Sequence, residues 1–102
     1  MSNSINTTLN ARQSTYGDYS DVAAITQSLM RIVESGASYE QMSDVQKTSL
    51  FMIANKMARI VNGNPAYDDS WHDISGYATL VVNDLKTAPV TPQAILDAEV
   101  VE

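Results

Sequence analysis

The stretch from residue 56 to residue 77, KMARIVNGNPAYDDSWHDISGY, decides how this chain folds. Lys56 and Arg59 stand near the carboxyl end of one predicted helix, and Asp69 and Asp73 stand near the start of the next. A Gly-Asn-Pro turn joins the two helices, because glycine ends a helix readily and proline cannot continue one. In an antiparallel pair of helices, the two cations therefore face the two carboxylates.

Apolar spacing around this stretch predicts an all-α fold, a small up-and-down helical bundle of three main helices at about 20–35, 43–62 and 69–86. The second is the central helix, because its middle, 50–54, is apolar on every side. In the third helix, apolar residues recur three and four positions apart, which is typical of a packed helical seam. These residues are Trp71, Ile74, Ala78, Val81 and Leu85.

Local signals predict the ends of the main helices. Ser20 or Asp21 is expected to cap the first, and Gly36 is expected to end it in a left-handed conformation. Ser43 and Gln46 have the spacing of a capping box at the start of the second.

The ends of the chain are predicted to be simpler, within a single domain of residues 1–102. Residues 1–4 are expected to be loose, and a short amphipathic helix follows over 5–16, ending in a Tyr-Gly-Asp turn. A C-terminal extension, 87–102, is expected to contain a short helix over 92–99. Its apolar residues are expected to pack on this chain or on a neighbour.

Composition excludes several classes of function. The chain has no cysteine, which excludes disulfide and thiol chemistry and fits the reducing cytoplasm. We expect no signal peptide and no membrane span, because no apolar run is long enough. A net charge of −6 opposes general nucleic-acid binding, since a polyanion would be repelled. A small domain without a disulfide or metal staple also predicts a homo-oligomer.

The charged residues of the opening stretch admit two interpretations. Asp69 and Asp73 could be oxygen ligands for Mg²⁺, while Lys56 and Arg59 bind phosphate oxygens. The alternative is an interhelical ion-pair network that fixes the register of the helices. Gly76, inside a helix, predicts close approach by another backbone or a ligand.

Other chemistry has less support in the sequence. Tyr16 and Tyr77 could stack on a base, or they could simply plug helix ends. His72 is the sole histidine, and no nucleophilic triad can be assembled around it. No phosphate-binding loop motif occurs. We therefore assign no catalytic residue.

Three segments resemble a family of small phage and prophage proteins recorded as a domain of unknown function. They are RQSTYGD at 12–18, KMARI at 56–60 and DSWHDISGYA at 69–78, and the resemblance covers roughly residues 9–86. In outline the family is similar to the all-α NTP pyrophosphatases of the MazG and dUTPase type, which place acids on paired helices around Mg²⁺. Their glutamate-rich ExxE motif has no counterpart on the central helix here. The resemblance thus leaves nucleotide binding open, with hydrolysis lacking its usual ligands.

Three hypotheses follow. The first is a non-catalytic phage protein that binds a nucleotide-like phosphorylated ligand and sequesters a signal in the host cytoplasm. The second is a Mg²⁺-dependent nucleotide pyrophosphatase with Asp18, Asp69 and Asp73 as ligands. The third is an interaction protein that binds a host protein or assembles with itself through a methionine-rich face or its tail helix. The residues predicted to bind ligand are Tyr16, Asp18, Lys56, Arg59, Asp69, Asp73 and Tyr77.

Overall fold

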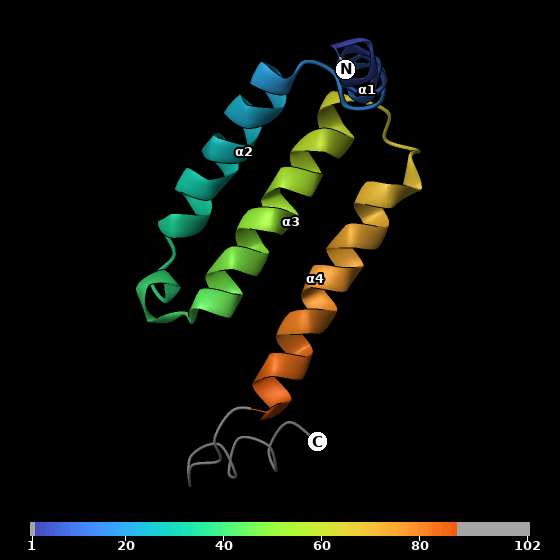
Figure 1. Cartoon of the computed structure of the whole chain (residues 1–102). Coiled ribbons are helices and arrows are strands. Elements are labelled where there is room, and N and C mark those ends of the chain that lie inside the picture. Colours follow the sequence, from blue (N-terminus) through green and yellow to red (C-terminus); the bar gives the residue numbers. More distant parts are fainter. Residues whose placement is uncertain (1, 88–102) are drawn as a thin grey trace, which may run out of the picture.

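The computed structural model describes residues 2–87, which are helical throughout apart from the connections and contain no strand (Figure 1). The elements are α1 (Ser2–Tyr16), α2 (Tyr19–Glu34), a 3-10 turn (Tyr39–Gln41), α3 (Asp44–Asn62) and α4 (Asp68–Thr87). The predicted all-α class is confirmed, and residues 2–87 contain four helices. Helix α1 has 15 residues and α2 has 16, so α1 is not the short helix that the sequence predicted. The predicted bundle layout is not confirmed. The predicted helix over 92–99 lies outside the described residues. Because α1 begins at Ser2, residues 2–4 are helical and not loose as expected.

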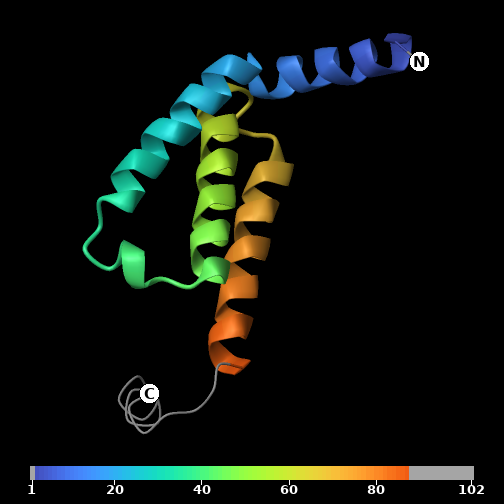
Figure 2. The same ribbon diagram turned by 60° about the vertical axis from the view of Figure 1, so that its left-hand side comes forward.

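The central position of α3 is also confirmed. Helix α2 packs on one side of α3 and α4 packs on the other, so the three long helices form an open layer (Figure 1). Helix α1 projects away from one end of this layer (Figure 2). The radius of gyration is 17.5 Å, whereas a compact domain of about 100 residues has about 13 Å. The projecting α1 contributes to this larger radius, and among residues 2–87 no further helix packs across either broad face of the layer.

The core is thin, because α3 shares one edge with each neighbour. The buried apolar side chains of the described residues are Val22, Met30, Ala54, Ala58 and Ile60. Small alanines on α3 let α2 approach closely. Between these helices the Asn55 side-chain amide donates to Thr26 Oγ1 (3.3 Å), and that hydroxyl donates to the Val22 carbonyl (2.8 Å). The buried hydroxyl of Thr26 is thereby satisfied.

The apolar seam predicted on α4 is only partly packed. Ile74 and Val81 are half-buried against α3, but Ala78 is exposed and Trp71 and Leu85 are each 55% exposed. The prediction that Trp71 belongs to the core is therefore wrong. Trp71 is exposed because α3 covers only one flank of the apolar stripe, and no other described helix covers the rest.

The helix ends agree with the sequence at α3 and differ at α2. Ser43 and Gln46 form the predicted capping box, with both reciprocal hydrogen bonds present. Helix α2 is preceded by Asp18, not capped at Ser20 or Asp21, because the chain leaves the preceding turn already helical at Tyr19. Gly36 follows α2 as predicted but is not left-handed. Within residues 2–87, Gly17 alone has a positive φ, of 80°.

Candidate functional site

The candidate site lies at a corner where the end of α1, the end of α3 and the connection to α4 meet. The Asn64 amide donates to the Thr15 carbonyl (2.7 Å), and the Asn62 side-chain amide donates to the Tyr16 carbonyl (3.0 Å). Gly63 sits directly against this backbone, with room for no side chain. Because these contacts join residues more than 45 positions apart, they fix α1 to the layer.

An aromatic–cation cluster covers this corner. The Arg59 guanidinium carbon lies 4.8 Å from the ring centroid of Tyr16, a cation–π distance. The Tyr67 ring meets Tyr16 edge-on, with centroids 6.1 Å apart and planes at 74°. Arg59 is therefore directed toward an aromatic ring contributed by α1. The sequence did not pair these residues, because their contact depends on the direction of α1.

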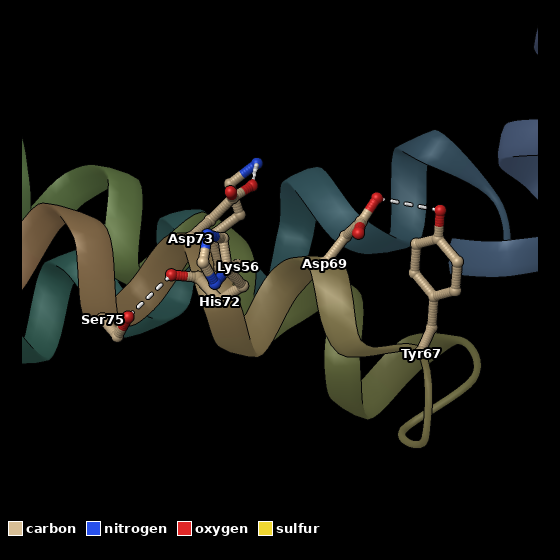
Figure 3. Close-up of polar contacts among 6 residues, drawn as sticks. All are labelled: Lys56, Tyr67, Asp69, His72, Asp73 and Ser75. Atoms are coloured by element: carbon tan, nitrogen blue, oxygen red, sulfur yellow. Dashed lines mark hydrogen bonds and ion pairs between the residues drawn. The ribbon is translucent and has the colours of Figure 1, made fainter.

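Two carboxylates near the start of α4, Asp69 and Asp73, each have their own partner (Figure 3). Lys56 Nζ lies 3.0 Å from Asp73 Oδ2, an ion pair of the kind that the interhelical alternative predicted. Tyr67 donates its hydroxyl to Asp69 Oδ2 (2.9 Å). This hydrogen bond, followed by the negative charge of Asp69, raises the pKa of Tyr67 above its ordinary value of 10.0.

The two remaining predicted residues lie apart from each other, Asp18 at the start of α2 and Tyr77 in the middle of α4. Asp18 Oδ1 accepts from the Gln13 side-chain amide (2.6 Å) and is exposed, and Tyr77 is half-buried on α4 one turn beyond Asp73. Residues 2–87 contain no group of three or more histidine, cysteine or acidic side chains that could hold a metal ion. The Lys56–Asp73 ion pair joins α3 to α4, and the Arg59–Tyr16 contact joins α3 to α1. The Tyr67–Asp69 hydrogen bond is local, because these residues are two positions apart.

The structure leaves Gly76 with open space. A Cβ built there would meet no other atom within 4 Å. The predicted close approach by another backbone or ligand is therefore not found among the described residues. Its helical position explains this, since Gly76 is on the side of α4 away from α3.

The sequence did not predict a groove that lies between α3 and α4. This cavity of about 290 Å³ is lined by Met42, Gln46, Ser49, Leu50, Ile53, Ala78 and Val81. Arg59 is nine residues, about two and a half turns, beyond Leu50, so their side chains leave opposite faces of α3. The groove and the Arg59 cluster are therefore on opposite sides of the layer. The sequence feature that could have predicted this groove is the apolar seam of α4, which is wider than one neighbouring helix can cover.

A family model described as Domain of unknown function (DUF6378) matches residues 1–84, which include all three of the motifs quoted above. No curated protein and no solved structure matches the chain. Over residues 2–87, none of the helices has the length and apolar character needed to cross a membrane.

Proposed function

The chain belongs to the DUF6378 family, and from its geometry we propose that it is a non-catalytic interaction protein. Its binding surface is one side of the α3–α4 pair, which we call the apolar face. On α3 this face consists of Leu50, Ile53, Met57 and Val61, and on α4 it consists of Trp71, Ala78, Val82 and Leu85. The groove residues Leu50, Ile53 and Ala78 place the two stripes on the same side of the layer.

The exposure of this face carries the proposal. Met57, Val61, Trp71, Val82 and Leu85 are between 44% and 70% exposed. Fully burying a large apolar side chain contributes about 1.5–3 kcal/mol, so covering these five half-exposed side chains would contribute on the order of 5 kcal/mol. Contiguous apolar surface of this kind marks sites of protein association.

Trp71 is positioned as the anchor of the apolar face. Its indole nitrogen donates to the Pro65 carbonyl at 2.9 Å, so the polar atom of the ring is already satisfied. The hydrogen bond also holds the ring in place while more than half of the side chain stays exposed. A fixed, exposed tryptophan is a frequent energetic centre of protein interfaces.

Matched leucine substitutions test this proposal. Leu85 (55% exposed) lies on the apolar face, and Leu80 (58% exposed) lies on another side of the same helix. We expect the expressed chain to elute in a complex heavier than 11.1 kDa, formed with itself or with another protein. Leu85→Glu should shift it to the monomer, and Leu80→Glu should not, when size-exclusion chromatography is combined with light scattering. Monomeric behaviour of all three chains would refute the proposal.

Binding of a nucleotide-like phosphorylated ligand is a second candidate function. The observation that favours it is the cluster of Arg59 with Tyr16 and Tyr67, which combines a cation for phosphate with aromatic rings for a base. Four further points stay predictions of the sequence and its resemblance. They are host-signal sequestration in the cytoplasm, Mg²⁺ binding at Asp69 and Asp73, a pyrophosphatase activity and a phage origin.

Calorimetry tests this candidate directly. We expect heat from at least one member of a panel of nucleotides and cyclic nucleotides, and Arg59→Met should reduce the affinity at least tenfold, because it removes the charge but keeps the length of the side chain. Arg31→Met is the matched control, since Arg31 is an exposed arginine on α2 that donates to Ser28. Equal binding by both variants, or no heat from any nucleotide, would exclude the cluster as a ligand site.

A further inference from the structure

Resting on the interaction function just proposed, we infer that the apolar face is occupied by a second copy of this chain. The two copies pack α4 against α4 in antiparallel orientation, about a two-fold axis near Ala78. Each copy contributes its α3–α4 pair, and together the four helices close into a bundle. Three features of the described residues lead to this arrangement: the symmetry of the α4 stripe, its charge pattern and the groove beside it.

The apolar stripe of α4 is symmetric about Ala78. Trp71 lies seven residues before Ala78, and Leu85 lies seven residues after it. An antiparallel dyad near Ala78 therefore places Trp71 beside the partner subunit's Leu85, and the reverse contact occurs at the other end. Ser75 and Ala78 at the centre are small, which permits close approach of the two helix axes. Small residues thus stand where the two helices would cross and a large residue stands at each end, where the helices diverge and leave more space between them.

The charges at the ends of α4 complement each other only in the antiparallel orientation. Asp68 and Lys86 are 18 residues apart, which is five helical turns, so both lie on the same flank of the apolar stripe. The dyad near Ala78 brings Asp68 close to the partner subunit's Lys86, and the same contact forms twice. A parallel pair would instead oppose Asp68 to its own copy and Lys86 to its own copy. The antiparallel arrangement also opposes the helix dipoles favourably.

The groove between α3 and α4 provides the space for the second helix. Helix α3 begins beside the carboxyl-terminal part of α4 (Figure 1), and Met42 and Gln46 line that end of the groove. The antiparallel dyad places the partner subunit's Trp71 at this end, where the groove is open. The groove residues Leu50 and Ile53 then become the interior of the four-helix bundle. This arrangement covers the part of the α4 seam that α3 leaves exposed.

The first test is the mass of the purified full-length chain in solution. We expect about 22 kDa by sedimentation equilibrium, twice the monomer mass of 11.1 kDa. Ala78→Glu places two carboxylates at the dyad and should weaken association at least a hundredfold, while Leu80→Glu should leave it unchanged. Circular dichroism of each variant reports whether the helices remain folded.

The second test fixes the orientation and does not depend on the folding of a disrupted variant. The chain has no cysteine, so Asp68→Cys and Lys86→Cys each introduce a single thiol at an exposed end of α4. With a short bis-maleimide reagent, a mixture of the two variants should yield cross-linked dimer, and neither variant alone should. Cross-linking of each variant to itself would mean a parallel pair, and this would overturn the inference.

The remaining outcomes separate this inference from the function on which it rests. A purified chain that is monomeric, but that forms a Leu85-dependent complex in cell extract, would overturn self-pairing and leave the interaction function standing. A monomer that dimerises only after truncation behind Thr87 would show that residues 88–102 occupy the face, which also overturns it. A chain that is monomeric in every setting would overturn both.

Discussion

Gly63→Ala is expected to lower the free energy of unfolding by about 3 kcal/mol or more. An added Cβ would collide with the Thr15 carbonyl oxygen and the Tyr16 Cα, and would lie 2.7 Å from the Tyr16 carbonyl carbon. All three are backbone atoms at the end of α1, so no side-chain rotation can relieve the clash. The corner would have to open, with loss of the Asn64-to-Thr15 hydrogen bond.

Thermal unfolding followed by circular dichroism measures this effect. For a domain of this size, each 1 kcal/mol corresponds to about 4–8 °C in Tm, so Gly63→Ala should lower Tm by more than about 10 °C. The matched control is Gly76→Ala, where a Cβ meets nothing within 4 Å. Because alanine is favoured over glycine within a helix by about 1 kcal/mol, this control should raise Tm. Equal Tm values for the two variants would show that the corner is not rigid.

Ala58→Leu is expected to produce the second large loss, of about 1–3 kcal/mol. Ala58 is 0% exposed and lies on the buried side of α3, near the corner. Leucine adds three carbon atoms where the packed helices leave no space, so α2 and α3 must separate or adopt strained rotamers. Separation would also stretch the Asn55–Thr26 hydrogen bond between these helices.

Urea titration of the variant at fixed protein concentration measures this loss. Ala11→Leu is the control, because Ala11 lies on the exposed surface of α1 and the same atoms are added there. A surface change of this kind should alter the free energy of unfolding by no more than about 0.5 kcal/mol. If both variants unfold at the same urea concentration, the thin α2–α3 core does not limit stability.

The sequence predicted the helices well, because their signals are local. Apolar spacing, the Ser43–Gln46 capping box and the turn after Asn62 each act within a few residues, and α3 and α4 begin and end close to the predicted positions. The Tyr-Gly-Asp turn was also predicted, and Gly17 carries its positive φ. What the sequence could not supply was which flank of each helix would be covered.

The same distinction between local and long-range contacts applies to the candidate site. The Lys56–Asp73 ion pair follows from an antiparallel hairpin alone, so the sequence predicted it. The contact of Arg59 with Tyr16 depends on the direction of α1, which is set by hydrogen bonds between distant residues. Trp71 was wrongly assigned to the core for a related reason. A heptad-like apolar stripe predicts that its residues will be covered, but it does not predict which helix or which chain covers them.

The position of Trp71 has a practical consequence. It is the only tryptophan of the chain, and its ring is fixed by the hydrogen bond to Pro65 on the surface where association is proposed. When the protein is excited at a wavelength that tyrosine does not absorb, its intrinsic fluorescence therefore originates from this one ring. Its emission wavelength and its quenching by iodide show directly whether that surface is exposed to solvent or covered by a partner, with no added label.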